Sequence, residues 1–406
     1  MQKPPLLMLV HRIPFPPNKG DKIRSFNLMK QLSKQFDIHL GCFVDDPFDM
    51  QYVGELSRWC VKVHCLAQSK WQAKLCGLSG FLTNAPITLP YYFSLSMHNW
   101  VKSTLQHNAI KHVLVYSSSM AQYVDDEKYT ALNRIIDFVD IDSDKWQQYA
   151  EKSTGIKRWF FRREAKLLQR YEQRVCQQFN KSLFVSEDEA SAFRQLVPAA
   201  DAAKVMSLLN GVDTDYFCPL TPLSATELAL PAHYIVFTGA MDYWANVDAV
   251  CWFSRNVWPK LKQRHPQLHF LIVGGNPSAD VKQLTKIDGV LVTGRVKDVR
   301  PYIQQALFAV APMLIARGIQ NKVLEAMALN KPIVCTSMAM EGINAPINVG
   351  TQVADGDDDF LAACQQLLDH PLEQHDSQQW ILAHFTWPNT LKKLPEYFLA
   401  EAAPCK

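Results

Sequence analysis

The sequence has no long apolar run and almost no net charge. No stretch approaches the roughly 20 consecutive apolar residues that a membrane-spanning helix requires. The net charge is only +3 over 406 residues, so the chain lacks the strongly basic balance that is typical of nucleic-acid-binding proteins. This balance still leaves room for a local basic patch.

Paired cysteines and an export signal are also missing. The ten cysteines are scattered without a CxxC pair or metal-ligand spacing, so we expect reduced, mostly buried thiols and no structural zinc. The opening MQKPPLLMLVHRIPFPP contains only a short apolar run, which ends at His11 and Arg12 rather than at a small-residue cleavage site. We expect that run to form a buried first strand and the chain to be cytoplasmic.

Several nucleotide-binding and catalytic motifs are absent as well. The VGGNP segment at 273–277 lacks the GxGxxG spacing of a dinucleotide fingerprint, so a nicotinamide-dependent enzyme is not expected. The sequence contains no GxxxxGK[ST], no HExxH and no GxSxG.

What the sequence does contain is a regular alternation of short apolar runs and helical patterns. Runs such as LLMLVH, DIHLGCFV and LHFLIVGG are typical of parallel strands that helices cover on both faces. One segment rich in Pro, Thr and Ser, at 209–232, separates two such series. We therefore predict an α/β protein with two doubly wound parallel sheets, in residues 1–208 and 233–385, joined by a linker at 209–232.

The stretch ARGIQNKVLEAMALNKPIV, at 316–334, has the features of a binding site. A helix N-terminus offers free N–H groups to an anion, Gly318 allows close backbone approach, and Lys322 adds a positive charge. An ionised Glu325 could accept hydrogen bonds from a vicinal diol such as a ribose. A surface helix with a Lys–Glu pair explains the same residues equally well.

A second candidate loop, PPNKGDKIRS at 16–25, follows the first predicted strand. Gly20 allows close backbone approach, and Asp21 is a candidate N-cap for the next helix. Lys22 and Arg24 put positive charge into a first helical turn, where acidic side chains are normally favoured. We interpret both as ligands of an anion, with solvated side chains as the alternative, chiefly for Lys22.

Two other segments stand out, one rich in aspartate and one rich in basic and aromatic residues. RIIDFVDIDSDKW ends an apolar strand with four aspartates, which should lie near a cleft or solvent because they repel one another; its DxD pattern is a weak metal signal. KRWFFRREAKLLQRYEQRV, at 157–175, predicts a basic amphipathic helix. That helix could lie on an anionic membrane with Trp159 and Phe160 at the interface, or its aromatic side chains could face the core.

Motifs along nearly the whole chain resemble those of the retaining GT-B glycosyltransferases of family 4. GIQNKVLEAMALNKPIV is similar to the signature in which a Glu-x7-Glu element precedes a strand. LNGVDTDYFCP resembles the interdomain element, and FVSEDEASAFR the strand and helix before it. FTGAMDYWANVDAVCWF, FLIVGGNP and VTGRVKDVRPYI resemble the donor domain, and PNKGDKIRSFNLMKQL resembles the N-terminal glycine loop. Together with IIDFVDIDSDKW, the arrangement is most similar to glycosyltransferases associated with exosortase exopolysaccharide systems.

The resemblance implies two Rossmann-like domains facing a central cleft, with a C-terminal helix at 386–406 that returns to the first domain. It implies that a sugar is transferred, with retention of its anomeric configuration, from a nucleotide-diphosphate sugar to a saccharide or lipid-linked saccharide acceptor. No metal or other cofactor and no nucleic acid is expected. The partners are then the donor and the acceptor, joined by the inner face of an anionic membrane if the helix at 157–175 lies on one.

The resemblance also implies which residues form the site. Asp137 and Asp140 would contact the transferred sugar or the acceptor hydroxyl, and Glu325 would hold the nucleotide ribose. The catalytic residues that we predict are Asp137, Asp140, Lys322 and Glu325. The substrate-binding residues that we predict are Gly20, Lys22, Arg24, Gly239, Met241, Asn246, Gly274, Arg295, Arg317, Gly318 and Asn321.

The sequence departs from the family pattern in its charges. Arg317 stands where family 4 usually has the first acid of Glu-x7-Glu, and Ala240 and Ala245 stand where an Arg and a Lys are common. A desolvated diphosphate still needs compensating charge. We therefore hypothesise that Lys322 and Arg295, with Arg317, bind the diphosphate instead.

Two other functions are compatible with the same motifs. A GT-B nucleotide-sugar 2-epimerase would turn over the donor without an acceptor. A non-catalytic nucleotide-sugar-binding subunit of a polysaccharide export system is favoured only by Arg317 and the missing Arg and Lys.

Overall fold

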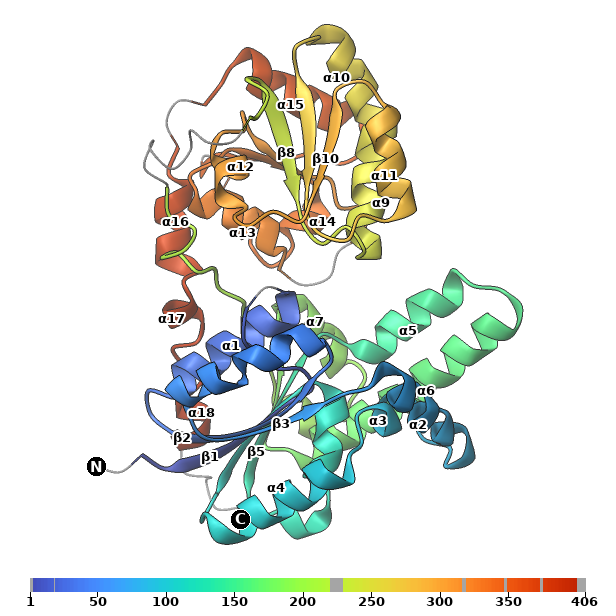
Figure 1. The fold of residues 1–406 in the computed structure, drawn as a ribbon, viewed down its shortest axis with the longest axis vertical. Coiled ribbons are helices and arrows are strands. Elements are labelled where there is room, and N and C mark those ends of the chain that lie inside the picture. The colour runs from blue at the N-terminus through green and yellow to red at the C-terminus, as the bar shows by residue number, and fades with distance from the viewer. Residues whose placement is uncertain are drawn as a thin grey trace. The chain divides into compact units, whose positions relative to one another are not determined.

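The computed structural model describes residues 3–17, 19–219, 229–315, 319–346, 349–372 and 375–399. Part of the predicted linker (220–228) and the end of the predicted C-terminal helix (400–406) lie outside the described residues, as do Arg317 and Gly318. The chain divides into unit 1, which comprises residues up to 208 and from 391 onward, and unit 2, residues 209–390. Each unit is built on one sheet with helices packed around it (Figure 1).

Unit 1 contains a seven-stranded parallel sheet in the order β3-β2-β1-β4-β5-β6-β7. Its strands are β1 (Pro5–Val10), β2 (Asp37–Val44), β3 (Cys60–Ala67), β4 (His112–Tyr116), β5 (Asn133–Val139), β6 (Lys181–Phe184) and β7 (Val205–Ser207). Its helices are α1 (Gly20–Leu32), η1 (Pro47–Arg58), α2 (Lys70–Leu82), α3 (Thr88–Tyr91), α4 (Leu95–His107), η2 (Ser118–Tyr123), η3 (Glu127–Tyr129), α5 (Asp142–Glu151), α6 (Gly155–Gln178), α7 (Glu187–Arg194), α8 (Ala199–Ala202) and α18 (Glu396–Leu399).

Unit 2 contains a six-stranded parallel sheet in the order β10-β9-β8-β11-β12-β13. Its strands are β8 (Tyr234–Thr238), β9 (His269–Val273), β10 (Val290–Gly294), β11 (Ala309–Ala311), β12 (Ile333–Cys335) and β13 (Thr351–Val353). Its helices are α9 (Trp244–Trp252), η5 (Phe253–Val257), α10 (Trp258–Arg264), α11 (Ala279–Gln283), η6 (Leu284–Lys286), α12 (Arg300–Gln304), α13 (Asn321–Ala328), α14 (Ser337–Met340), α15 (Asp357–Asp369), α16 (Ser377–His384) and α17 (Trp387–Thr390).

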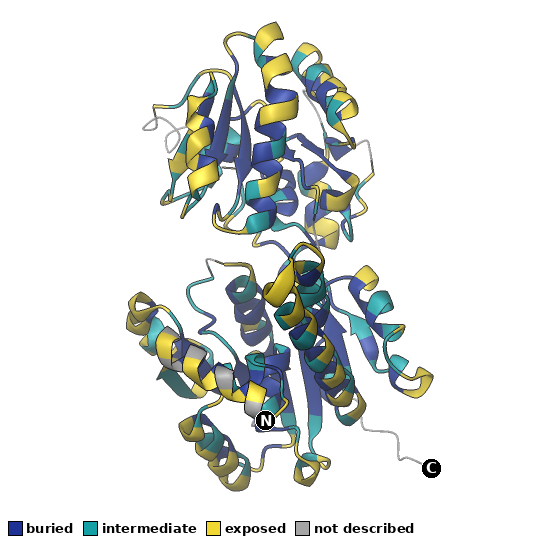
Figure 2. Ribbon diagram, turned by 90° about the vertical axis from the view of Figure 1, so that its right-hand side faces the viewer, coloured by how far each residue is buried: buried dark blue, intermediate teal, exposed yellow. Residues whose placement is uncertain are grey.

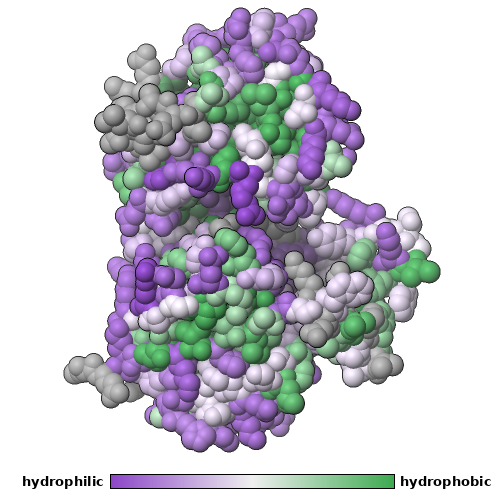
Figure 3. Space-filling view, in the orientation of Figure 1, coloured by the Kyte–Doolittle hydropathy of each residue, from purple (hydrophilic) through white to green (hydrophobic). Residues whose placement is uncertain are grey.

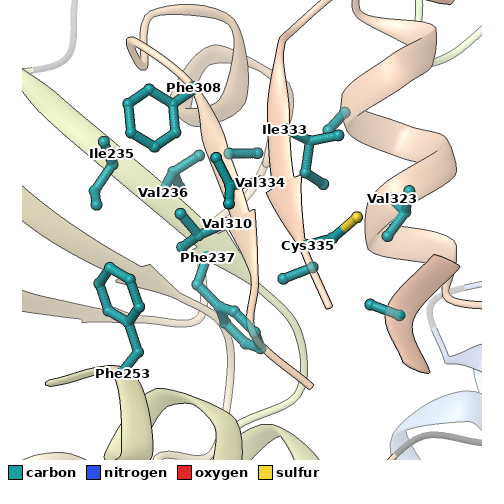
Figure 4. Close-up of a cluster of buried hydrophobic side chains, with 14 of the residues drawn as sticks. Ile235, Val236, Phe237, Phe253, Phe308, Val310, Val323, Ile333, Val334 and Cys335 are labelled. Atoms are coloured by element: carbon teal, nitrogen blue, oxygen red, sulfur yellow. The ribbon is translucent and has the colours of Figure 1, made fainter. Parts of the chain in front are cut away.

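The central strands of each sheet are buried because helices cover both faces, as the unbroken apolar runs predict. The edge strands β3 and β10 are largely exposed or half-buried. Figure 2 shows buried strands and helices that are exposed on their outer faces. In unit 2, side chains of β8, β11 and β12 interdigitate with those of α13 and the segment after α9, including Phe237, Val310 and Val323 (Figure 4). The two sheets confirm the predicted fold class, two doubly wound parallel-sheet domains.

The N-terminal caps of two helices, α7 and α1, differ. Ser186 caps α7, because its hydroxyl accepts a hydrogen bond from the Glu189 N–H at 3.2 Å, as a serine at this position commonly does. Asp21 does not cap α1: the helix begins at Gly20 after Lys19, and Asp21 lies inside the first turn.

The tail, predicted as one helix, contains two four-residue helices, α17 and α18. The second of them packs on unit 1, where Asn133 Nδ2 donates to the Tyr397 carbonyl at 3.2 Å. No helix in the described ranges is long and apolar enough to cross a membrane.

Candidate functional site

The strand order shows where to look for a site in each unit. In a doubly wound sheet, ligands bind beyond the carboxyl ends of the strands, at the point where the strand order reverses. That point lies between β1 and β4 in unit 1 and between β8 and β11 in unit 2. In unit 2 it is bounded by the loop after β8 and by the residues that lead into α13.

In unit 2, the loops after β8 and β9 are locked together by backbone contacts. The Met241 N–H donates to the Gly275 carbonyl at 2.9 Å, and the Ser278 N–H donates to the Met241 carbonyl at 3.1 Å. A Cβ atom at Gly274 would lie 1.7 Å from the Gly239 carbonyl oxygen, so only glycine fits there. Gly239, Met241 and Gly274, which the resemblance implies as donor ligands, therefore form one rigid edge.

Asn246 positions this edge from the first turns of α9. Its Nδ2 donates to the Ala240 carbonyl at 2.9 Å, and it lies close enough to Gly239 that a Cβ atom there would meet Nδ2 at 2.6 Å. Its Oδ1 is buried and has no hydrogen-bond partner among the described residues. Ala245 is buried and Ala240 exposed, so these two positions contribute no charge to the loop.

Lys322 and Glu325 lie in the first two turns of α13, beside the switch point. The Lys322 Nζ atom lies 3.2 Å from Gln320 Oε1 and 5.4 Å from the centroid of the Phe237 ring, at the end of β8. Within the described part of the chain it forms no ion pair with a carboxylate, so the alternative explanation, a surface Lys–Glu pair, is not supported. Gln320 gives α13 no side-chain cap, and the described residues offer no partner to the Asn321 and Lys322 N–H groups, which a ligand can therefore bind.

The pKa values of both residues are shifted towards neutrality. Burial lowers the pKa of Lys322 to about 8, although the nearby Glu325 raises it in part. Burial raises the pKa of Glu325 to about 7, although Lys322 lowers it in part. A lone, half-buried ammonium at a helix N-terminus is costly unless an anion joins it.

A second positive charge lies at the same edge of the sheet. Arg295 directly follows β10 and is exposed, and a Cβ atom at Gly275 would lie 3.5 Å from its Nε. It has no ion-pair partner within the described ranges. Asn321, also predicted as a ligand, has a buried Oδ1 without a described hydrogen-bond partner.

In unit 1, Lys22 and Arg24 are used inside the fold. Lys22 Nζ pairs with Asp49 Oδ2 at 2.8 Å, and Arg24 Nε pairs with Asp137 Oδ2 at 2.9 Å. Both basic side chains are only 1% exposed, and Asp137 is fully buried. Their binding of an anion, and sugar contact by Asp137, stay predictions that this geometry does not favour.

Two of the three remaining aspartates at the end of β5 pair with a neighbouring lysine. Lys145 Nζ lies 2.8 Å from Asp140 Oδ2 and 3.2 Å from Asp142 Oδ1, and desolvation of this lysine is outweighed by the two carboxylates, which raise its pKa. Asp140 is partly exposed at the carboxyl edge of the sheet, so contact with a sugar stays a prediction there. Gly20, a predicted substrate-binding residue, faces open space, since nothing lies within 4 Å of the position that a Cβ atom would take there.

The sequence reasoning missed a polar cluster at the end of β1. Arg12 hydrogen-bonds to Asp21 and pairs through Nε with Asp45 Oδ2 at 3.0 Å, while His11 Nε2 lies 3.4 Å from the Asp21 carboxylate. The His11 ring stacks on Tyr116, at the end of β4. Burial tends to raise the pKa of Asp21, but His11 and Arg12 hold it well below its usual range. The sequence carried a signal for this cluster, because charged residues stand just after two predicted strands: Arg12 two residues after β1 and Asp45 directly after β2.

Backbone strain marks the neighbouring strand ends. Ser117, after β4, has φ = 77°, and Val139, at the end of β5, has φ = 71° beside an irregularity in the strand register. These values are unfavourable for side chains with a Cβ, above all a β-branched one, and such strain concentrates at functional sites. The Ser117 N–H donates to the Asp137 carbonyl at 2.8 Å, which ties the two strained ends together.

Comparison with known proteins agrees with this architecture. Residues 232–370, within unit 2, match the family model described as "Glycosyl transferases group 1". No curated protein sequence matches the chain.

Solved structures that resemble the whole chain are GT-B glycosyltransferases. Alr3699/HepE from Anabaena, in complex with UDP, is 14% identical with a TM-score of 0.67 and covers 98% of this chain and 100% of its own. Sucrose-phosphate synthase from Thermosynechococcus elongatus is 16% identical with a TM-score of 0.71, at 98% and 99% coverage. WaaG, a glycosyltransferase involved in lipopolysaccharide biosynthesis, is 12% identical with a TM-score of 0.65, at 98% and 100% coverage. The chain therefore has the GT-B fold, and its C-terminal unit matches the group 1 glycosyl transferases in sequence.

Proposed function

We propose that the protein is a retaining glycosyltransferase. It transfers a hexosyl group from a nucleotide-diphosphate sugar to a saccharide or lipid-linked saccharide acceptor in exopolysaccharide biosynthesis. The observation that carries the proposal is the half-buried Lys322 at the start of α13, which has no acidic ion-pair partner among the described residues and lies beside Glu325 and the interlocked glycine loops. The family match over 232–370 and the UDP and UDP-glucose bound by Alr3699/HepE support the donor class.

Each donor group has a candidate partner in unit 2. The diphosphate is bound by Lys322, Arg295 and the first N–H groups of α13, which take up negative charge as the glycosidic bond breaks. The ribose is held by Glu325 through its hydroxyl groups. The edge formed by Gly239, Met241 and Gly274 lets the backbone approach the ligand. This scheme relies on fixed positive groups and requires no metal.

Unit 1 would bind the acceptor. Asp140 and the His11–Arg12–Asp21 cluster are polar groups at the carboxyl edge of its sheet, where acceptor hydroxyls can be bound. A lipid-linked acceptor lies at a membrane surface, so the proposal includes peripheral association with the cytoplasmic face of an anionic membrane.

Turnover of a donor panel tests the proposal. Purified protein is incubated with different nucleotide-diphosphate sugars, with and without saccharide acceptors or membrane extract, and release of the nucleoside diphosphate is measured. Acceptor-dependent release, with a product of unchanged anomeric configuration, supports a retaining transferase. Isomerisation of the donor sugar without an acceptor would instead identify an epimerase, and tight binding without turnover on any acceptor would identify a binding subunit.

A further inference from the structure

Unit 1 carries a helical projection formed by α2, α5 and α6. The hairpin of α5 and α6 extends away from the sheet, with α2 beside it (Figure 1). The buried face of α6 begins only at Glu164, so its first turns, residues 155–163, reach beyond the core. Neither the proposed donor site nor the proposed acceptor site involves these turns.

The projection is held firmly by contacts between α2 and α6. Phe81 of α2 stacks on Trp159 with ring centroids 6.3 Å apart, and Arg163 donates to the Gly80 carbonyl at 2.7 Å. Glu164 accepts hydrogen bonds from the Ile87 N–H at 2.8 Å and the Thr88 N–H at 3.1 Å. The surface that α2 and α6 present is therefore preformed.

Each of the two helices exposes large apolar side chains. On α6, Ile156 is 86% exposed and Trp159 60%; on α2, Trp71 is 79% exposed and Leu75 61%. Each pair is spaced by three or four residues and so lies on one face of its helix. Apolar surface is visible on the projection in Figure 3. Phe160, by contrast, packs against Phe81 and the rings of the α5–α6 hairpin, so only part of the aromatic segment faces the core.

The same turns concentrate positive charge. Residues 155–166 contain five basic residues and one acidic residue, a net charge of +4, whereas the whole chain carries +3. The single acid, Glu164, is buried and already accepts two backbone hydrogen bonds. Arg158, Arg162 and Lys166 recur every four residues and line a shallow groove of about 370 Å³ with Trp159.

We propose that this surface docks on the headgroup region of a bilayer containing anionic phospholipids. Exposed Trp and aliphatic side chains insert at the interface, while Arg158, Arg162 and Lys166 bind lipid phosphates. Charge complementarity commits the surface to an anionic bilayer, because an apolar protein partner would not need a cationic groove beside the tryptophan. The inference rests on the membrane association in the proposed function, but binding to lipid is measured without donor or acceptor.

Vesicle co-sedimentation tests the docking surface. The full chain is mixed with vesicles of phosphatidylcholine alone or of phosphatidylcholine with phosphatidylglycerol, and its partition coefficient is measured at low and high salt. Wild type should bind the anionic vesicles and be released by salt. The double variant Arg158→Glu/Arg162→Glu should lose at least about thirtyfold in partitioning, and Ile156→Ser/Trp159→Ser at least about tenfold.

A matched control separates this surface from net charge. Lys102 and Lys286 are exposed elsewhere, so Lys102→Glu/Lys286→Glu changes the net charge equally and should bind like wild type. The four charged side chains that are reversed are exposed, so melting temperatures of both charge variants should stay unchanged. Ile156→Ser/Trp159→Ser also removes the stacking of Trp159 on Phe81, so its folding is checked by its melting temperature. Donor binding measured in solution should be unaffected in all variants. Equal binding by wild type and Arg158→Glu/Arg162→Glu would overturn the proposal. So would equal loss in the control, absence of binding to anionic vesicles, or a dimer that Ile156→Ser/Trp159→Ser dissociates.

Discussion

Replacing Lys322 by methionine should make the protein more stable and a poorer donor binder. The methionine keeps a similar length and apolar stem but removes the ammonium that burial disfavours. In the unliganded protein this ammonium has only the Gln320 Oε1 atom and the Phe237 ring as described partners. In the donor complex it would face the diphosphate. The two states therefore respond to Lys322→Met with opposite signs.

The size of the stability gain follows from the pKa. Burial lowers the pKa of Lys322 from 10.5 to about 8, which corresponds to a cost of about 3 kcal/mol for keeping the charge in the folded state at pH 7. Below pH 8 both the folded and unfolded chains hold the proton, so this cost is fully present. Between pH 8 and 10.5 the folded chain releases its proton first, and stability should rise. The Lys322→Met variant should therefore be up to about 3 kcal/mol more stable to unfolding than wild type at pH 7. Its stability should not rise between pH 8 and 10.5.

The loss of affinity follows from the missing charge-assisted contact. Such a hydrogen bond contributes about 1.5–3 kcal/mol, so the Kd for UDP should increase about ten- to hundredfold. Urea unfolding across pH measures the stability, and calorimetric titration with UDP measures the affinity.

Lys331→Met is the matched control. Burial also lowers the pKa of Lys331 to about 8, but this residue precedes β12, at the opposite end of the sheet from the proposed donor site, and donates to the Ala306 carbonyl. The Lys331→Met variant should bind UDP like wild type. Unchanged UDP affinity in Lys322→Met, or a Lys322→Met protein that is less stable than wild type at pH 7, would refute the assignment.

Urea unfolding of four further variants tests the site and the residues that support it. The pKa of Glu325 is raised by burial from 4.5 to about 7, so wild type should lose stability as the pH rises through this interval, where the folded carboxyl holds its proton longer; a Glu325→Gln variant that keeps the same pH profile would contradict this. Gly274→Ala should cost at least about 2 kcal/mol, because its Cβ atom would lie 1.7 Å from a carbonyl oxygen, whereas Gly20→Ala, with open space around it, should cost less than about 1 kcal/mol. Arg24→Leu should cost about 3–5 kcal/mol, since it leaves Asp137 buried and unpaired, and a variant as stable as wild type would rule out a structural pair.

Much of the fold was predictable because the apolar pattern that indicates a buried strand lies within a few consecutive residues. Unbroken apolar runs such as DIHLGCFV, which forms β2, indicate buried parallel strands, and a serine such as Ser186 just before a helical pattern indicates a helix start. Short strands such as β13 carry too few residues for a pattern. They form because a neighbouring strand, here β12, supplies the hydrogen bonds.

The candidate site was predictable to a lesser extent because charge alone does not tell which partner a side chain finds. Lys22 and Lys322 both stand in the first turn of a helix after a strand. The first is paired by Asp49, which lies 27 residues away, and the second has no acidic partner among the described residues. Only the tertiary structure distinguishes them. The His11–Arg12–Asp21 cluster lies within one segment, from the end of β1 to the first turn of α1. It was missed because the sequence does not show that Asp21 folds back onto Arg12, or that Asp45, after β2, joins them.

The way the chain enters and leaves unit 2 has a practical consequence. The Val212 N–H donates to the Phe385 carbonyl at 2.7 Å, and Val212 pairs with Thr386 in a parallel bridge. A Cβ atom at Gly211 would lie 2.6 Å from the Trp387 nitrogen, so glycine lets the two segments touch. Residues 209–390 are thus a continuous insertion whose ends adjoin. This arrangement suits excision as a separate polypeptide or exchange between related enzymes, with both cuts made at a single point on the surface of the unit.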